Sequence, residues 1–300
     1  MSESHAYVIQ APAAVLKITL VEVDKLYIHE EIIPRILSWL AEKIVKDGVF
    51  KDPIIVDEKT LVVLDGMHRV AAAKELGFKY IPVCLVDYDN PNIGLYAWSR
   101  VVRVKEAARA AYKDPDSAER AIRDSLSLLG YRLVRVASLE AGREALARRE
   151  LSALLVFPSG FLGAKAATRD IKLIYDGIKR VEQVLENRGF EVGYYTESDA
   201  VDLVSKGEAV AALIPPTITK DEVRSVALRG EVFIHKATRH VIPARPLGID
   251  VPLDWLTGRY SLEEARKMLV DHLFRRKIKR LPPGTVLDRR YEEELYVFES

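Results

Sequence analysis

The chain has 300 residues, of which 49% are hydrophobic and 30% are charged, and its formal net charge is +1. This length and composition predict a soluble globular protein with one large domain or two modest ones. The nearly neutral charge argues against a protein whose main task is to coat nucleic acid, because such proteins carry a clear basic excess. Nucleic acid is therefore not expected as the main partner.

The sequence contains one cysteine, Cys84, which excludes an intramolecular disulfide and a cysteine-rich zinc site. Its apolar neighbours predict a role in core packing. No apolar run is long enough to cross a bilayer and no signal-peptide pattern is present, so we expect a cytoplasmic location and no membrane partner. Asparagine and glutamine are scarce beside abundant Arg, Lys and Glu, a composition typical of proteins from hot environments.

The first hundred residues predict an α/β unit. A helix is expected to begin at Pro34 and to end at Gly48. Its apolar face is predicted to contain Ile36, Leu37, Leu40, Ile44 and Val45. Two short strands at 53–57 and 60–65 predict a hairpin, followed by a helix that stops at Gly77 and a strand over 80–88. Turn residues near position 90 end this pattern.

The rest of the chain predicts a second α/β pattern after a charged, mostly helical stretch over 95–150. Strands are expected at 153–157, 190–195, 208–214 and 231–235, and helices at 171–189, 199–207 and 220–230. Capping-box spacing occurs at Asp116 with Glu119, Thr219 with Glu222, and Ser261 with Glu264. The fold class expected is α/β of the α+β type. The domains expected are 1–100 and 101–300, with the boundary placed only within 100–150.

The bend between the strand at 60–65 and the next helix concentrates polar residues that suit an anion. Gly66 lets a ligand approach the main chain, and a helix start offers unpaired amides and a partial positive charge. His68 and Arg69 add donors, and an arginine fork matches phosphate oxygens. The alternative is that both are ordinary surface residues and that Asp65 only caps the helix.

The segment "LDGMHRVAAAKELG", with the preceding strand pair and the following "IPV", resembles the ParB/sulfiredoxin superfamily. The resemblance covers about residues 15–90 and implies a nucleotide-binding N-terminal domain with a second α/β domain closing over it. Sulfiredoxins place a reactive cysteine where this chain has Met67. A thioether cannot form the sulfur intermediates of a thiolate, so that branch is excluded.

Two branches of the superfamily remain. The partitioning ParB proteins bind CTP and DNA, but no persuasive helix-turn-helix follows the turn here, so a nucleotide-gated DNA-binding protein is the alternative. The segments "LYIHEEII" and "RGEVFIHKATRHVIPARPLGIDVPL" resemble the free L-serine kinase family, which includes the siderophore-pathway kinase SbnI. Ile234 and His235 stand where that family's pattern suggests a pair of prolines, and this departure leaves the shape of the loop open.

The serine kinase resemblance implies a role for each matching residue. Glu30 is expected to accept the proton of the serine hydroxyl, with Glu31 as its competitor, and Asp65 to bind Mg²⁺ or orient that hydroxyl. The nucleotide phosphates are expected at Gly66, Met67, His68 and Arg69. L-Serine is expected at Trp98, Lys236, Thr238, Arg239 and His240. The implied phosphoryl donor is ADP, with ATP as the alternative, and the product is O-phospho-L-serine.

Two other patterns do not indicate a site. The segment "FPSGFLGAKAATRD" (157–170) lacks the spacing of a phosphate-binding loop. We expect it to be a mobile loop that covers the active-site cleft between the two predicted domains. The histidines at 29, 235 and 272 have no metal-ligand spacing, so a structural zinc ion is not expected.

Overall fold

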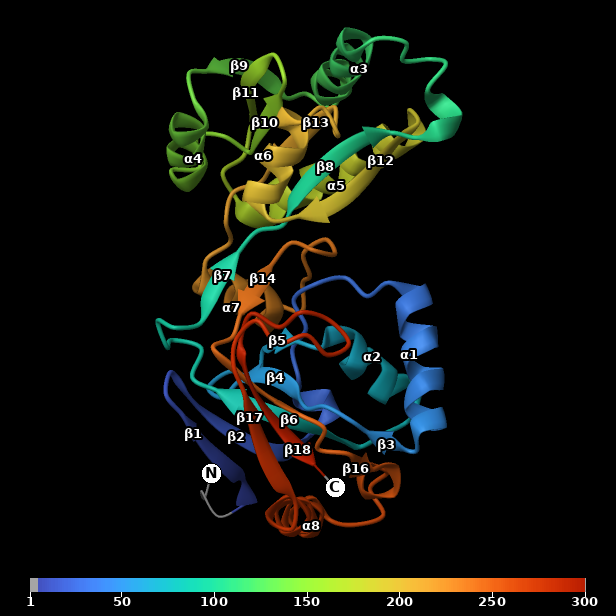
Figure 1. The fold of residues 1–300 in the computed structure, drawn as a ribbon, viewed down its shortest axis with the longest axis vertical. Helices are drawn as coiled ribbons and strands as arrows, with labels where there is room; N and C mark the ends of the chain where they lie inside the picture. Colours follow the sequence, from blue (N-terminus) through green and yellow to red (C-terminus); the bar gives the residue numbers. More distant parts are fainter. Residues whose placement is uncertain (1–4, 300) are drawn as a thin grey trace. The chain divides into compact units, whose positions relative to one another are not determined.

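The structure is a computed structural model that describes residues 5–299. The chain divides into two compact units. Unit 1 contains the residues up to Gly94, then 223–235 and the residues from His240 onward; unit 2 contains 95–222 and 236–239. Both units mix helices with sheets (Figure 1), which confirms the expected α/β class of the α+β type.

Unit 1 is built around a mixed sheet with the strand order β1-β2-β6-β4-β5. Its neighbouring strands are antiparallel except β4 and β6, which run parallel. The elements are β1 (Tyr7–Ala11), β2 (Ala14–Glu22), β4 (Ile54–Asp57), β5 (Val63–Asp65), α2 (Met67–Glu75) and β6 (Tyr80–Val86). The parallel strands β4 and β6 require a crossover connection, which consists of β5 and helix α2. The hairpin and strand predicted here are confirmed.

Helix α1 (Pro34–Asp47) begins and ends where the sequence predicts, with Gly48 in the left-handed conformation at φ 70°. Proline fits the first helical position because its missing N–H would have no partner there. The predicted apolar face is only partly right. Ile44 is buried, whereas Ile36 is 36% exposed and Val45 is 56% exposed. The helix packs on α2, so the covered stripe is narrower than the apolar pattern.

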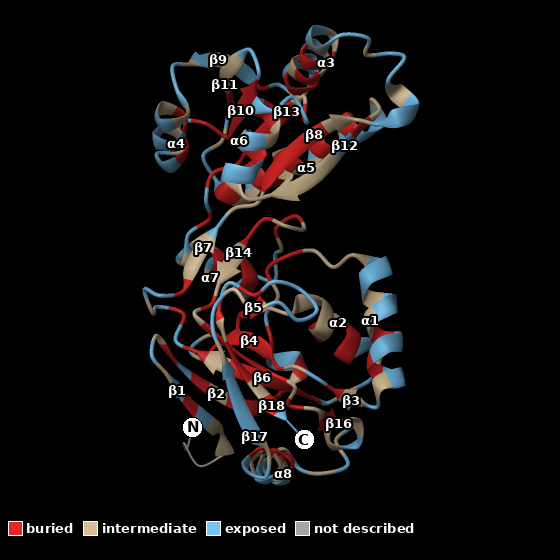
Figure 2. Ribbon diagram, in the orientation of Figure 1, coloured by how far each residue is buried: buried red, intermediate tan, exposed pale blue. Residues whose placement is uncertain are grey.

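The core of unit 1 lies along the central strands β2, β4 and β6 (Figure 2). These strands contribute side chains that are fully shielded from water, among them Leu16, Ile18, Ile54 and Ile55. Cys84 on β6 is also fully buried, as predicted, and burial raises the pKa of its thiol to about 12. A thiol of that acidity stays protonated at neutral pH and is a packing residue rather than a nucleophile.

The C-terminal segment belongs to unit 1, although the sequence assigned it to the second domain. Helix α8 (Leu262–Phe274) packs on β2 and β1, and β16 (Val251–Pro252) pairs with β3 (Val49–Phe50). A separate sheet has the order β15-β18-β17, formed by β15 (Ala244–Leu247), β17 (Lys277–Leu281) and β18 (Glu294–Glu299). These long-range pairings hold the last sixty residues against the N-terminal sheet.

Unit 2 is an antiparallel sheet with the order β12-β8-β13-β10-β11-β9. Its strands are β8 (Ser99–Val104), β9 (Arg132–Val136), β10 (Ala153–Phe157), β11 (Gly160–Lys165), β12 (Phe190–Tyr195) and β13 (Ala211–Ile214). Its helices are α3 (Pro115–Leu128), α4 (Leu139–Ala147), α5 (Ile171–Asn187) and α6 (Glu197–Ser205). A core cluster joins α4 and α6 to the sheet through Leu146, Leu154, Val204 and Ala212.

The chain passes from one unit to the other within three of its elements. These are β7 (Gly94–Tyr96) at 94/95, α7 (Lys220–Leu228) at 222/223 and β14 (Arg239–Val241) at 239/240. The capping boxes predicted for α7 and α8 are present. Thr219 and Glu222 exchange hydrogen bonds of 3.2 and 2.7 Å, and Ser261 does the same with Glu264.

Several expectations for the second half are wrong. Residues 99–104 form β8 rather than a helix, and Asp114 caps α3 in place of the predicted Asp116–Glu119 box. Residues 231–235 form only an isolated bridge at Phe233 rather than a strand. The supposed mobile loop is largely β11, paired with β10 and β9. For β8, pairing with the distant strands β12 and β13 overrides the local pattern.

Within residues 5–299, no helix has both the length and the apolar character needed to cross a membrane. The same residues contain no group of three or more His, Cys, Asp or Glu side chains that could hold a metal ion by themselves.

Candidate active site

The turn between β5 and α2 can be built only with glycine. Gly66 has a φ of 97°, and a Cβ there would lie 2.6 Å from Ile54 Cγ2 and 2.9 Å from Arg69 Nη2. Gly66 is the N-cap of α2 and no side chain caps the helix, so the alternative reading of Asp65 as a simple cap is wrong. The start of a helix carries a partial positive charge from its first amides, and in this turn Arg69 N donates to Gly66 O at 2.9 Å.

Asp65 is held at this turn by two arginines. Its Oδ2 accepts hydrogen bonds from Arg245 Nη1 at 2.5 Å and Arg69 Nη2 at 3.4 Å. Burial alone would raise the pKa of Asp65, but the charges of Arg245 and Arg69 outweigh it and hold the pKa well below the usual range. The carboxylate is therefore ionised at every physiological pH.

One oxygen of Asp65 remains available. Among the described residues Oδ1 has no partner, and the side chain is 42% exposed. Mg²⁺ takes one or two protein carboxylates and completes its shell with phosphate and water. The residues at the turn thus fit the expected metal: Asp65 would supply one oxygen.

Arg69 is partly committed to the protein itself. Its Nη1 donates to the carbonyl oxygens of Asp52 at 2.8 Å and Pro53 at 3.2 Å. These bonds tie α2 to the chain just before β4 and fix the guanidinium beside Gly66. The predicted contact between Arg69 and phosphate stays a prediction.

The segment that contains Glu30 lies next to this turn. The backbone N–H of Ile33 donates to His68 Nε2 at 3.0 Å, which links residues 30–33 to the first turn of α2. Because Nε2 accepts, the neutral ring of His68 has its proton on Nδ1. The ring of His68 also meets that of His235 edge to face, with centroids 5.7 Å apart. The sequence predicted His68 as a phosphate ligand, and the structure gives it this bridging contact.

Glu30 is buried, with 6% exposure, while Glu31 is half-buried. The backbone at 29–31 pairs with Phe233, which donates to His29 O at 2.8 Å and accepts from Glu31 N at 2.9 Å. Glu30 thus has a buried carboxylate, and backbone hydrogen bonds on both sides of the residue fix its segment. Such a carboxylate suits a proton acceptor better than an exposed one does. This burial favours Glu30 over Glu31.

His240 is positioned by a hydrogen bond that the sequence did not reveal. Its Nε2 lies 2.7 Å from the hydroxyl of Tyr88, which is fully buried. The guanidinium of Arg224 lies over the Tyr88 ring at 4.9 Å. Tyr88 thus connects a predicted substrate residue to the ion-pair network around Arg224.

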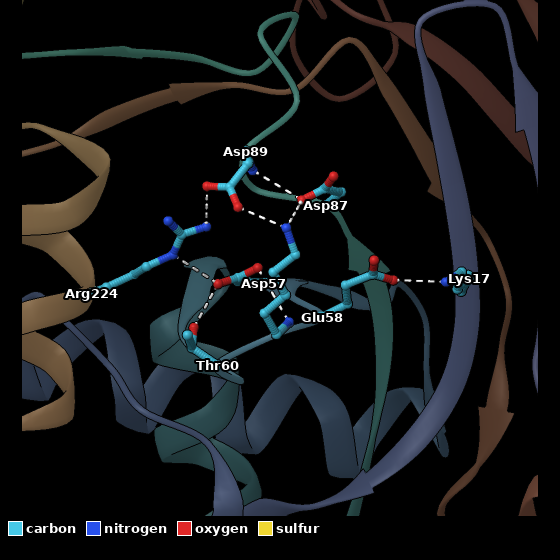
Figure 3. A network of polar contacts seen from close by, with 8 residues as sticks. Lys17, Asp57, Glu58, Thr60, Asp87, Asp89 and Arg224 are labelled. Atoms are coloured by element: carbon cyan, nitrogen blue, oxygen red, sulfur yellow. Dashed lines mark hydrogen bonds and ion pairs between the residues drawn. The ribbon is translucent and has the colours of Figure 1, made fainter. Parts of the chain in front are cut away.

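That network fixes Arg224 from two sides (Figure 3). Its Nε donates to Asp57 Oδ2 at 3.0 Å, and its Nη2 pairs with Asp89 Oδ1 at 2.7 Å. Lys59 bridges Asp87 and Asp89 at 3.0 and 2.7 Å. Asp57 is fully buried, so this pairing offsets the cost of burying its charge.

The other predicted serine-binding residues lie in unit 2. Lys236 Nζ lies 5.0 Å from the ring centre of Trp98, and the guanidinium of Arg239 lies 5.7 Å from it. Lys236 has a φ of 60°, which is uncommon for a residue with a side chain and often marks a functional position. Thr238 is buried. The structure thus brings Trp98, Lys236 and Arg239 together, and their contact with L-serine stays a prediction.

A buried ion pair supports Trp98. Arg100 Nη1 donates to the carbonyl of Trp98 at 2.6 Å, and Arg100 Nε donates to Glu182 at 2.7 Å. Arg100 also packs over the rings of Tyr175 and Tyr194.

Arg245 and Tyr88 are the residues that sequence reasoning missed. The signal for Arg245 was present: it is a single charge between Ala244 and Pro246 in a strand that is buried throughout. A charge in such a strand requires a buried partner, and Arg245 has two, Asp65 and Glu293.

The buried His29 is expected to make the free energy of unfolding depend on pH. Burial lowers the pKa of His29 despite the opposing charge of Glu30, and its Nδ1 lies 2.8 Å from Val63 O. The neighbouring ring of His240 lies 5.4 Å away. Since the unfolded chain takes up the proton first as pH falls below about 6.5, the free energy of unfolding should decrease there. Urea denaturation between pH 7 and 5 should show a smaller decrease in the free energy of unfolding for His29→Asn than for the wild type. An equal decrease in both proteins would contradict this prediction.

Comparisons with known proteins identify relatives over most of the chain. No family model matches the chain. An ATP-dependent L-serine kinase of Staphylothermus marinus is 31% identical over 274 residues, which cover 85% of this chain and 100% of that protein. An ADP-dependent L-serine kinase of Thermococcus kodakarensis is 28% identical over 252 residues, or 79% of this chain and 91% of that protein.

Solved structures show the same relationship. A free serine kinase in complex with AMP has 26% identity and a TM-score of 0.62, over 80% of this chain and 93% of its own. SbnI from Staphylococcus aureus has 17% identity and a TM-score of 0.62, over 86% and 96%, which is a likeness of fold. Among the relatives found by sequence rather than by structure, a ParB-like protein of Sulfolobus acidocaldarius is 30% identical over 213 residues, or 71% of this chain and 84% of that protein.

The fold and the glycine turn at Gly66 place the chain among the ParB-like α/β proteins, as the resemblance implied. Within that class, 31% identity along the full length of a curated relative settles the assignment. The chain belongs to the free L-serine kinase family.

Proposed function

We propose that this protein phosphorylates the hydroxyl group of free L-serine with ADP or ATP and releases O-phospho-L-serine. The observation that carries the proposal is the 31% identity to an L-serine kinase over the whole of that relative. The buried Glu30, on a segment hydrogen bonded to the Gly66 turn, supports it.

Phosphoryl transfer to an alcohol needs alignment, charge neutralisation and a proton acceptor. The serine hydroxyl oxygen forms a bond to the terminal phosphorus of the nucleotide, and the bond to the bridging oxygen breaks. Glu30 accepts the hydroxyl proton. The amides that follow Gly66 hold the phosphates, and Met67 contributes backbone there rather than a reactive side chain.

Bound Mg²⁺ would neutralise the phosphate charge during transfer. Asp65 is suited to hold it because its Oδ1 has no partner among the described residues, while Arg245 and Arg69 fix Oδ2. These two arginines keep the carboxylate ionised, as a metal ligand must be.

An amino acid substrate presents a carboxylate and an ammonium group. Lys236 and Arg239 supply positive charge for the carboxylate, and Trp98 offers a flat apolar wall beside them. Thr238 and His240 are the remaining candidates, the latter with its ring held by Tyr88. Selectivity for serine over threonine would depend on the space that these side chains leave at the β-carbon.

A product assay tests the function. The protein is incubated with Mg²⁺, each of ADP and ATP, and serine, threonine or homoserine, and phosphorylated amino acids are detected by mass spectrometry. We expect O-phospho-L-serine, together with AMP if the donor is ADP and ADP if the donor is ATP. Relatives of both donor types are similarly distant, at 28% and 31% identity. Therefore the nucleotide product is what identifies the donor.

The assay can also contradict the proposal. Absence of phosphoserine with either nucleotide, together with tight duplex DNA binding that weakens steeply with salt, would instead favour the nucleotide-gated DNA-binding alternative.

A further inference from the structure

Unit 2 contains a polar cavity of about 590 Å³ that the serine kinase reaction does not use. It lies beside the start of β9, the end of β11 and the turn between α4 and β10. Its lining includes four cationic residues and one carboxylate, at Arg132, Arg149, Lys165, Arg169 and Glu150. The cavity therefore has a strong excess of positive charge.

Two of these cations face each other directly. Arg132 on β9 and Lys165 on β11 are Cα partners in the antiparallel ladder, so their side chains project from the same face of the sheet. Like charges in this arrangement are destabilising. Within residues 5–299, neither side chain has an ion pair or a side-chain hydrogen bond, and the same holds for Arg169. An anion between them would convert this repulsion into attraction.

The other two charged residues are already committed. Arg149 donates to Thr217 O at 2.8 Å and to both oxygens of Glu222. The backbone of Arg149 has a φ of 55°. Its guanidinium is held in place by these hydrogen bonds. Glu150 accepts from Arg148 at 2.8 Å, and that bond, with smaller contributions from Lys165 and Arg169, lowers its pKa. One paired carboxylate cannot neutralise three unpaired cations.

Two hydroxyl groups complete the lining. Ser152 Oγ accepts from Ala166 N at 3.1 Å, and Thr168 Oγ1 accepts from Asp170 N at 3.0 Å. Because each hydroxyl acts as the acceptor, its own O–H remains available, and the described residues give neither an acceptor. Ser152 is buried. A buried donor without an acceptor is costly unless a ligand or water accepts from it.

Protection of a sheet edge does not explain the charges. β9 is the edge strand, and exposed charges on an edge strand prevent pairing with other chains. Arg135 on β9 fits that role. Lys165 does not, because β11 is paired on both sides.

We propose that this cavity is a second anion site, distinct from the Gly66 turn, that binds a small phosphate-bearing anion. Three unpaired cations and two free O–H donors exceed what a single carboxylate requires, and they match the charge and oxygen count of a phosphate group. The cavity volume admits a small phosphate ester as well as free phosphate. The site does not depend on the kinase reaction.

Calorimetric titration of the full-length protein tests the site with three probes: inorganic phosphate, O-phospho-L-serine and AMP. Titrations omit Mg²⁺ and serine. Lys165→Gln removes one of the facing charges, and Arg135→Gln is the matched control, since it removes one charge from the adjacent strand outside the cavity. We expect Lys165→Gln to weaken binding of at least one probe by about tenfold or more, and Arg135→Gln to change it by less than about twofold.

The three probes distinguish the sources of phosphate. Binding of all three identifies a phosphate site, whereas a preference for phosphoserine or for AMP identifies a site for a reaction product. Unchanged affinity of Lys165→Gln for every probe would overturn the proposal, as would an equal loss in Arg135→Gln. Because phosphoserine formation is assayed separately, failure of the kinase function and failure of this site can be told apart.

Discussion

Replacement of Glu30 by glutamine is expected to lower the turnover of serine phosphorylation by about 10²- to 10⁴-fold, the usual contribution of a general base. Glutamine has nearly the same shape, so the backbone pairing of this segment with Phe233 should survive. The amide cannot accept the hydroxyl proton. Nucleotide affinity should change by less than about twofold, because we expect the phosphates to bind at the Gly66 turn rather than at Glu30.

The matched control is Glu31→Gln, which makes the same substitution one residue later. Glu31 is half-buried, and its backbone N–H is the group that contacts Phe233. Its side chain is therefore expected to matter much less for turnover. Initial rates of phosphoserine formation and calorimetric nucleotide affinities separate the two effects. If Glu31→Gln lost as much turnover as Glu30→Gln, the assignment of the base to Glu30 would fail.

The sequence was informative wherever a local rule applies. Pro34 and Gly48 mark the ends of α1, and Thr219 and Ser261 cap their helices as predicted. Gly66 was identified from its position between strand and helix, and the structure shows why no other residue fits there. Each of these features depends on contacts within a few residues.

Features that depend on distant partners could not be predicted. Residues 99–104 form a strand because they pair with β12 and β13 from about one hundred residues later. Residues 231–235 contain three consecutive apolar residues, yet the bridge described for this segment is the isolated one between Phe233 and Glu30. Tyr88 and His240 are 152 positions apart, so their hydrogen bond leaves no local pattern.

The same limit applies to the chemistry of Asp65. Its sequence position suggested either a cap or a metal ligand, and the deciding partner, Arg245, lies 180 residues away. Arg245 is itself buried between Asp65 and Glu293, which accepts from its Nε at 2.6 Å. Burial alone would lower the pKa of Arg245, but the charges of Asp65 and Glu293 outweigh it and raise the pKa above its usual range.

Replacement of Arg245 by methionine is accordingly expected to lower the free energy of unfolding by about 3–5 kcal/mol, as is usual when one partner of a buried ion pair is removed. Methionine fills part of the volume but leaves Glu293 buried and without its Nε partner, and Asp65 without its shorter hydrogen bond. Urea denaturation followed by circular dichroism measures the loss.

The control combines two changes. In Arg245→Met with Glu293→Gln the second buried charge is also removed, so part of the lost stability should return, because an uncompensated carboxylate costs more than a neutral amide. Arg245→Lys should lie between the wild type and Arg245→Met, since lysine keeps the charge but lacks the fork that reaches both carboxylates. If Arg245→Met were as stable as the wild type, Arg245 would not be the residue that secures Asp65 at the Gly66 turn.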